Sequence, residues 1–161
     1  MGSVVFLLDE SGSMSCRKKD TVKGFNCFLE DLKEKHPDAK LTLYMFNSKC
    51  KCVYNDVPVQ EVKDLTSDDY SPTGGTALFD SMGEILTKYK DGKFIILTDG
   101  YENDSETYTM KAVKKLVTNT WMDITYIGAD VTQSFALGIR KSEYYNGRDT
   151  MGAFRSASQT V

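Results

Sequence analysis

Short runs of apolar and β-branched residues recur along the chain and predict a series of β-strands. Five of these runs cover residues 4–8, 41–46, 50–54, 93–98 and 121–127, and a sixth, shorter run at residues 143–145 predicts an edge strand. The first run is apolar throughout, which is typical of a strand covered on both faces. Only three residues separate the second run from the third, so these two strands must pair antiparallel.

Residues with helical spacing occupy most of the segments between these runs. The helix after the first strand presents its apolar face from Val22 to Leu32 and ends at Pro37. One helical turn is expected within residues 59–65, and an amphipathic helix over residues 78–89. A further helix is expected from Thr109, with Met110, Val113, Leu116 and Val117 on its buried face. Two more are expected, one from Asp130 to Leu137 and one from Asp149 or Thr150 onward.

Strands that alternate with helices imply parallel pairing through right-handed crossovers. We therefore expect a doubly wound α/β fold over residues 1–161 as a single domain. It should have a mostly parallel central sheet with one antiparallel edge strand, and helices on both faces. In such sheets ligands bind beyond the carboxyl ends of the strands, at the switch in strand order. Polar residues at those strand ends are the first candidates for a functional site.

Composition and charge are typical of a small soluble domain. The chain has 161 residues, of which 40% are hydrophobic, enough for a core and too many for intrinsic disorder. A formal net charge of −3 argues against a general nucleic-acid binder, which needs clustered basic residues. The longest apolar runs have four or five residues, and the first strand leaves no room for a signal peptide. We therefore expect a cytoplasmic protein that binds neither nucleic acid nor membrane.

The cysteine and histidine residues offer little for catalysis or metal binding. Cys16, Cys27, Cys50 and Cys52 are even in number, but in a chain without a leader we expect free thiols. Cys50 and Cys52 would share one face of a strand, and a zinc site there is a weak alternative because their spacing is not C-x-x-C. The single histidine, His36, lies in a charged helix end, so a Ser-His-Asp or Cys-His mechanism has little support.

Three strand ends carry oxygen-bearing residues instead. The first strand runs into a loop with Asp9, Ser11 and Ser13, a Gly-Gly-Thr loop ends at Thr76, and the fourth strand runs into Asp99. Asp9, Ser11 and Ser13 occupy alternate positions along the chain, so an extended loop can direct all three side chains to one point. Oxygen-only ligands suit a hard cation such as Mg²⁺ or Mn²⁺, and Mg²⁺ takes about six of them near 2.1 Å.

These three motifs together, in register with the predicted strands, resemble the von Willebrand factor A (vWA) domain and its metal-ion-dependent adhesion site (MIDAS). The likeness extends over essentially the whole chain and is nearest to small stand-alone vWA proteins of bacteria and their phages. It implies that Ser11 and Ser13 bind the metal directly and that Thr76 does so directly or through water. Asp9 and Asp99 would act mostly through water and hydrogen bonds. The resemblance also implies a non-enzymatic protein-binding module, in which a partner's acidic side chain completes the metal shell.

Two other functions remain as alternatives. Asp9 would serve as the phosphoryl-accepting nucleophile of a Mg²⁺-dependent hydrolase or phosphotransferase of the haloacid-dehalogenase type, but Ser11 stands where the general acid is expected. The chain would otherwise be a structural vWA domain that binds no metal. A Walker-type phosphate loop, a Gly-x-Gly-x-x-Gly fingerprint and a Gly-x-Ser-x-Gly elbow are all absent from the sequence.

Several residues beside the three motifs have both a structural and a binding interpretation. The basic run that begins at Arg17 is favoured as a solvated helix start, with a cationic rim for an acidic partner as the alternative. Tyr70 and Tyr101 are expected as exposed loop aromatics, or as anchors for a partner. Glu102 and Asp104 are expected on the face of the site, where they would repel an acidic ligand.

Overall fold

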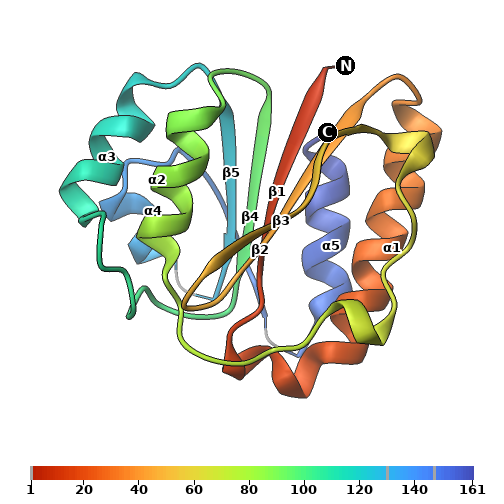
Figure 1. Ribbon diagram of the computed structural model, residues 1–161, viewed down its shortest axis with the longest axis horizontal. Helices are drawn as coiled ribbons and strands as arrows, with labels where there is room; N and C mark the ends of the chain where they lie inside the picture. Colours follow the sequence, from red (N-terminus) through yellow and green to blue (C-terminus); the bar gives the residue numbers. More distant parts are fainter. Residues whose placement is uncertain (1, 130, 147) are drawn as a thin grey trace.

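The computed structural model describes residues 2–129, 131–146 and 148–161. The strands in this part of the chain are β1 (Ser3–Asp9), β2 (Lys40–Phe46), β3 (Cys50–Pro58), β4 (Lys93–Thr98), β5 (Asp123–Gly128) and β6 (Lys141–Tyr144). They form one sheet in the order β3-β2-β1-β4-β5-β6 (Figure 1). Neighbouring strands run parallel except β2 and β3, which are antiparallel, so the expected fold class is confirmed.

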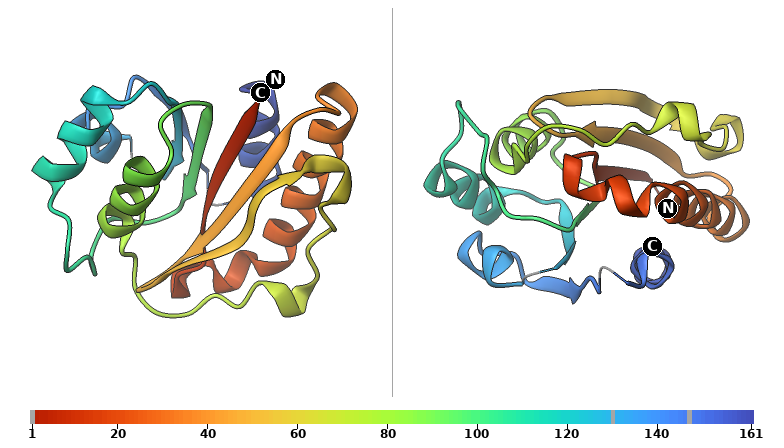
Figure 2. Two further views of the ribbon diagram at one scale, coloured as in Figure 1. Left: turned by 45° about the horizontal axis from the view of Figure 1, so that its top comes forward. Right: turned by 90° about the horizontal axis from the view of Figure 1, so that it is seen from below.

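Helices cover both faces of the sheet. They are α1 (Lys18–Lys35), α2 (Leu78–Lys88), α3 (Met110–Asn119), α4 (Thr132–Ala136) and α5 (Thr150–Gln159), with short 3₁₀ turns η1 (Gly12–Arg17), η2 (Val59–Glu61) and η3 (Ser67–Asp69). α1 and α5 lie on one face, and α2, α3 and α4 lie on the other (Figures 1 and 2). None of these helices has the length and apolar character needed to span a bilayer.

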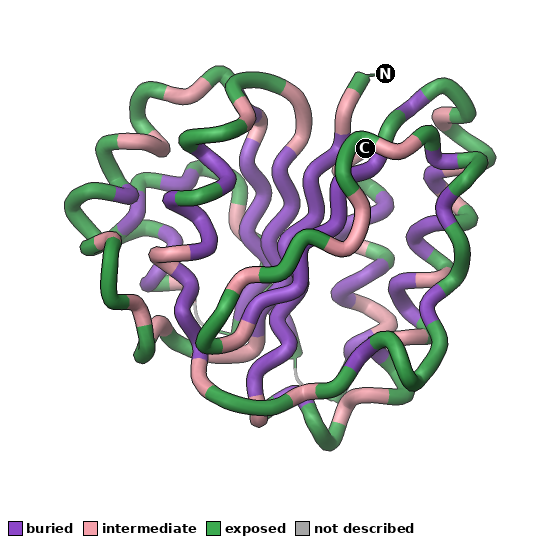
Figure 3. The backbone as a smooth tube through the Cα atoms, viewed as in Figure 1, coloured by how far each residue is buried: buried purple, intermediate pink, exposed green. Residues whose placement is uncertain are grey.

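The central strand β1 contributes to the cores on both faces of the sheet. Val4, Phe6 and Leu8 belong to the core beneath α1 and α5, while Val5 and Leu7 belong to the core beneath α2 and α3. All five side chains are at most 1% exposed, and Figure 3 shows the central strands buried along most of their length. The continuous apolar run in the sequence therefore corresponds to a strand buried on both faces.

The contact between α1 and α5 is centred on an aromatic cluster over β1. The centroid of the Phe6 ring lies 5.7 Å from that of Phe25, 5.0 Å from that of Phe28 and 6.0 Å from that of Phe154. Gly24 of α1 faces Phe154 of α5 so closely that a Cβ atom on Gly24 would overlap the phenyl ring. The close approach of these two helices therefore depends on a residue without a side chain.

The strand order reverses between β1 and β4. From β1 the chain proceeds outward through β2 and β3, and then returns to β4 on the other side of β1. β1 ends at Asp9 and β4 ends at Thr98, and both ends lie at the lower edge of the sheet in Figure 1. Seen from that side, the segment that follows β1 lies near the middle of the molecule (Figure 2, right). Parallel pairing thus brings two of the three motifs to the switch point of the sheet.

Several element boundaries differ from those predicted. β3 continues to Pro58, beyond residue 54, and the apolar pattern did not mark this part because most of the strand is exposed or only partly buried. β6 covers residues 141–144 rather than 143–145. α4 begins at Thr132, and its predicted cap, Asp130, lies outside the described residues.

Two large apolar residues lie in surroundings other than those predicted. Trp121 is 88% exposed and precedes β5, because the Met122 N–H turns back to the hydroxyl of Thr120 before the strand begins. Met110, predicted to be buried, is 39% exposed. α3 packs chiefly against α2 rather than on the sheet, and only Val113 of α3 is fully buried.

We expect Gly24→Ala to destabilise the fold, although alanine is the better helix former by about 1 kcal/mol. The added methyl group would meet the Phe154 ring, and overpacking of this kind costs about 1–3 kcal/mol. Urea denaturation should show a lower free energy of unfolding, and a smaller penalty when Phe154→Leu is already present. Lys23→Ala, an exposed change on the same helix, is the control and should stay within about 0.5 kcal/mol. A gain in stability for Gly24→Ala would contradict this packing.

Candidate metal centre

Asp9, the last residue of β1, is the buried centre of the candidate site. It is 0% exposed, and its Oδ1 accepts a hydrogen bond from the Ser11 N–H at 2.7 Å while its Oδ2 accepts one from the Thr98 hydroxyl at 2.6 Å. The Tyr70 hydroxyl donates to the Asp9 carbonyl oxygen. Burial raises the pKa of Asp9 and the charge of Asp99 adds to the rise, although the bonds from Ser11 and Thr98 oppose it. A cation bound beside Asp9 would favour its charged form.

The loop after Asp9 presents two serine hydroxyls side by side. Ser11 is extended, with φ −74° and ψ 165°, and Ser13 lies in the turn η1. Their Oγ atoms are 3.3 Å apart. Adjacent ligands of an octahedral Mg²⁺ ion, each near 2.1 Å from the metal, are about 3.0 Å apart, so the two hydroxyls have nearly the separation that neighbouring ligands need. The Gly12 N–H donates to the Gly74 carbonyl oxygen at 3.0 Å and joins this loop to the second motif.

Thr76 follows the tight turn of that second loop, in which Gly74 has a φ of +75° that favours glycine. Thr76 is 4% exposed, and Asn103 clamps its backbone. The Thr76 N–H donates to Asn103 Oδ1 at 2.8 Å, and the Asn103 N–H donates to the Thr76 carbonyl oxygen at 2.9 Å. A Cβ atom on Gly100 would lie 3.7 Å from Thr76 Oγ1, so this hydroxyl faces the strand end after β4. Asn103 is a positioning residue that no motif in the sequence indicates.

Asp99 joins the strand end after β4 to the serine loop. Its Oδ1 accepts a hydrogen bond from the Ser13 hydroxyl at 2.7 Å, and its Oδ2 lies 2.6 Å from Arg17 Nη1. The same Nη1 donates to the Ser13 carbonyl oxygen at 2.9 Å. Arg17 is therefore neither the solvated helix start nor the cationic rim of the two interpretations above. It pairs with a candidate metal residue, because η1 turns it back over the loop.

The structure brings the five predicted site residues to one place. Hydrogen bonds connect Asp9, Ser11, Ser13 and Asp99, and Thr76 joins them through its loop. Two carboxylates and three hydroxyls, without sulfur or imidazole, fit a hard divalent cation. Within residues 2–129, 131–146 and 148–161, no group of three or more His, Cys, Asp or Glu side chains is placed to hold a metal ion. The candidate therefore depends on its hydroxyl oxygens. The four cysteines are free thiols, as predicted.

Two residues beside the site differ from their predicted positions. Tyr70 is fully buried rather than exposed, because its hydroxyl finds a partner inside the protein at the end of β1. Glu102 turns inward, and its carboxylate accepts hydrogen bonds from three backbone N–H groups. Tyr101, which is 57% exposed, and the exposed Asp104 remain on the surface near the second loop. Of the two acids predicted to repel an acidic ligand, only Asp104 is therefore placed to do so.

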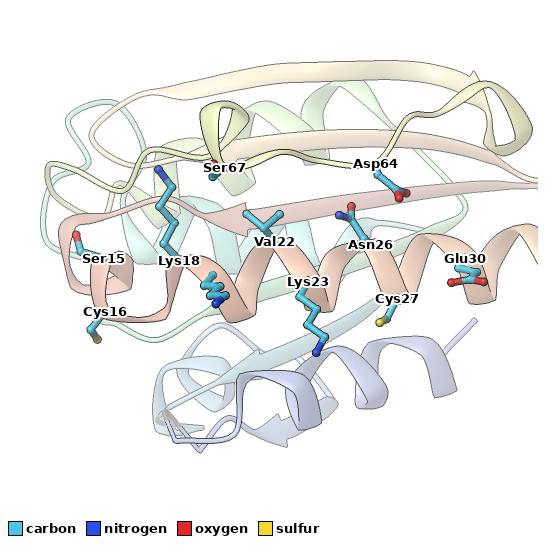
Figure 4. A pocket seen from close by; sticks show the side chains of 11 residues that line it. Ser15, Cys16, Lys18, Val22, Lys23, Asn26, Cys27, Glu30, Asp64 and Ser67 are labelled. Atoms are coloured by element: carbon cyan, nitrogen blue, oxygen red, sulfur yellow. The ribbon is translucent and has the colours of Figure 1, made fainter.

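A groove of about 840 Å³ runs along the exposed side of α1, beside the serine loop (Figure 4). Lys18, Lys19 and Lys23 supply positive charge to its lining, and Glu30 and Asp64 supply negative charge. Because the lining carries both signs, its charge alone selects no class of partner.

An acidic side chain of α2 holds the loop after β4, which carries Asn103. Asp80 accepts hydrogen bonds from the backbone N–H groups of residues 106–108 at 2.7–3.0 Å. Partial burial raises the pKa of Asp80, but the three N–H donors outweigh it and hold the pKa below the usual range of an aspartate. Asp80 thus supports, through this loop, the residue that clamps Thr76.

Comparison with known proteins gives a family match. A family model described as von Willebrand factor type A domain matches residues 2–137. The matched region contains all three motifs and five of the strands. No curated protein matches the chain at a significant level of sequence similarity.

Several solved structures share the fold at low sequence identity. The PilB minor pilin from Streptococcus sanguinis has a TM-score of 0.74 at 13% identity, over 99% of this chain and 60% of that chain. Proximal thread matrix protein 1 from the mussel byssus has a TM-score of 0.66 at 13% identity, over 98% of this chain and 46% of that chain. One structure of the mussel protein is described with a zinc-occupied MIDAS motif. This chain therefore spans only part of either protein, and the likeness concerns the fold alone.

We expect Asp80→Asn to lower the free energy of unfolding at pH 7 by about 1–3 kcal/mol, because the charged acceptor of three N–H groups is lost. The folded-state pKa of Asp80 lies below its unfolded value near 3.9, so this stabilisation is present above that value and disappears as the pH falls through the folded-state pKa. Urea unfolding at several pH values between 7 and 2 would measure how the difference in free energy of unfolding between wild type and variant decreases as the pH falls. Asp91→Asn, in the exposed turn before β4, is the matched control. A difference in free energy of unfolding that did not change with pH would contradict the role given to the Asp80 carboxylate.

Proposed function

Since the chain belongs to the von Willebrand factor type A domain family, we propose that it is a non-catalytic module that binds a partner protein through a divalent cation, Mg²⁺ or Mn²⁺. The partner contributes an Asp or Glu side chain, and residues 1–161 act as one domain. The observation that carries this function is the pair of serine hydroxyls 3.3 Å apart, beside a buried carboxylate at the switch point of the sheet. Neither nucleic acid nor membrane has a part in it.

The proposed direct ligands are the hydroxyl oxygens of Ser11, Ser13 and Thr76. Asp9 stands behind them, because both of its carboxylate oxygens already accept hydrogen bonds from the protein. Asp99 accepts a hydrogen bond from the Ser13 hydroxyl, so the hydrogen of that group points to Asp99 and an oxygen lone pair can face a cation. A cation held mainly by neutral oxygens remains electrophilic and supplies one coordination position for a carboxylate from the partner.

The surroundings of Asp9 favour binding over phosphoryl transfer. A phosphoryl-accepting aspartate needs an accessible oxygen and a second acid nearby. Asp9 is 0% exposed with both oxygens engaged, and the position two residues later is Ser11. These observations support the binding module over the haloacid-dehalogenase alternative.

Two further observations support the proposed cation and compartment. The mussel byssus protein, whose domain shares this fold, has been solved with zinc in its MIDAS motif, which is an example of a divalent cation in such a domain. The four free thiols favour a reducing compartment, and we propose the cytoplasm.

Calorimetric titration with Mg²⁺ and with Mn²⁺ tests the metal site. We expect saturable binding to the wild-type protein, and roughly tenfold to hundredfold weaker binding to Ser11→Ala and Asp99→Asn, because one loses a ligand and the other a supporting carboxylate. Ser156→Ala, which changes a serine of α5, is the matched control and should bind like the wild type. A wild-type protein without saturable binding at millimolar metal would contradict the proposed function.

Affinity capture on the immobilised protein tests the mode of partner binding. Proteins retained in Mg²⁺ should be released by EDTA and should not be retained by Ser11→Ala, because the metal bridges the two chains. Mass spectrometry identifies the retained protein, and replacing its coordinating Asp or Glu by Asn or Gln should abolish retention. A specific partner that binds equally well in EDTA would rule out recognition through the metal.

A further inference from the structure

Arg17 introduces a positive charge into the candidate metal centre. Its Nη1 atom lies 2.6 Å from Asp99 Oδ2 and donates to the Ser13 carbonyl oxygen at 2.9 Å. The Ser13 hydroxyl donates to the other carboxylate oxygen of Asp99 at 2.7 Å. Arg17 and Ser13 together thus engage both oxygens of a carboxylate that supports the metal site in the proposed function.

We propose that Arg17 is an internal counter-ion of Asp99 that competes with the divalent cation, so that metal binding requires Arg17 to release this carboxylate. This inference rests on the proposed function, since it concerns the same site. It extends that function by assigning a residue that lowers the metal affinity and couples metal binding to a side-chain movement. The exchange is between two cations that are attracted to one carboxylate, and it involves no covalent step.

Partial burial strengthens this ion pair relative to a pair on the surface. The Asp99 side chain is 5% exposed and that of Arg17 is 24% exposed. Arg155 and Asp149 form a longer pair, at 3.5 Å, with side chains that are 67% and 55% exposed. Water screens such exposed pairs, whereas a shielded pair at 2.6 Å keeps more of its Coulomb attraction. Without a metal ion, Arg17 therefore offsets part of the negative charge of Asp9 and Asp99.

The same charge opposes a second cation on Asp99. A divalent ion and a guanidinium that share one partly buried carboxylate repel each other, and the low local dielectric constant strengthens this repulsion. This repulsion drives Arg17 away from Asp99 when a metal ion binds, and the loss of the ion pair lowers the metal affinity. Removal of the guanidinium charge should therefore improve metal binding.

The place of Arg17 in the chain allows its side chain to move. It is the last residue of η1 and the N-cap of α1, with φ −115° and ψ 10°, so it lies at the junction of the two elements. The guanidinium sits at the end of a flexible aliphatic stem and is already partly exposed. A turn toward solvent therefore exchanges its contacts with the protein for water.

Dissociation constants for Mg²⁺ and Mn²⁺ in four proteins test this inference: the wild type, Arg17→Met, Arg17→Lys and Lys19→Met. Arg17→Met keeps an aliphatic stem without the charge, so we expect metal binding to tighten roughly fivefold to fiftyfold. Arg17→Lys keeps the charge and should remain within about threefold of the wild type. Lys19→Met removes a charge from an exposed lysine two residues later, in α1, and should change the affinity by less than about twofold.

Unchanged or weaker metal binding in Arg17→Met, relative to Lys19→Met, would overturn the inference. If the wild-type protein still bound metal in that case, the proposed function would stand. If no variant bound metal, the proposed function would fail as well, so the two failures are distinguishable. Circular dichroism melting curves establish that each variant is folded.

Nuclear magnetic resonance of the wild-type protein provides a second readout that needs no destabilising variant. Rotation of the Arg17 guanidinium should be slow without metal, because its partners, Asp99 and Ser13 among them, hold it. The rotation should become faster when Mg²⁺ is added, because the bond to Asp99 is lost. Arg17→Lys assigns the signal, and Arg155, whose ion pair is exposed, should show no such change. A rotation rate that does not rise at saturating Mg²⁺ would overturn the inference.

Discussion

A carboxylate buried at the end of the central strand is the constraint on which the rest of this structure depends. Burying an ionised group without partners costs several kcal/mol, so Asp9 requires donors. The fold supplies them from separate segments: the N–H of Ser11 next in the chain, and the hydroxyl of Thr98 from β4. Tyr70 adds a bond to the backbone of Asp9 from a third segment. The loops that meet at this edge of the sheet therefore supply the hydrogen bonds that the buried Asp9 requires.

This accommodation leaves an incomplete charge balance. Neutral donors lower the cost of burying Asp9 but do not cancel its charge, and burial still raises its pKa. Arg17 supplies one positive charge against the two carboxylates of Asp9 and Asp99. At the proposed metal site, stability without metal and affinity for metal would therefore be opposed. The ion pair of Arg17 that stabilises the metal-free arrangement would reduce the free energy gained when a divalent ion binds.

The sequence predicts features that depend on local pattern and on topology. Apolar runs mark the strands, and alternation with helices leaves few strand orders, so Asp9 and Asp99 are expected at one edge before any coordinates are known. Contacts between distant segments carry no such signal. Arg17 meets Asp99 across 82 residues, and Tyr70 reaches the end of β1 across 61. By local pattern Arg17 is part of a helix start and Tyr70 is a loop aromatic. Asn103 likewise lies in a loop without a motif.

The distribution of charge around the site bears on how a partner is recognised. The chain as a whole carries only −3, and the groove beside the serine loop is lined by both signs, so a broad electrostatic match is a poor basis for specificity. A carboxylate coordinated at one point gives a short, directional contact that requires no such match. Under the proposed function, selectivity would then come from the surface beside the site, where Tyr101 and Asp104 are exposed on the loop after β4. Because the carboxylate of Glu102 accepts bonds from the backbone of that loop, Asp104 is the acid there that would repel an acidic partner.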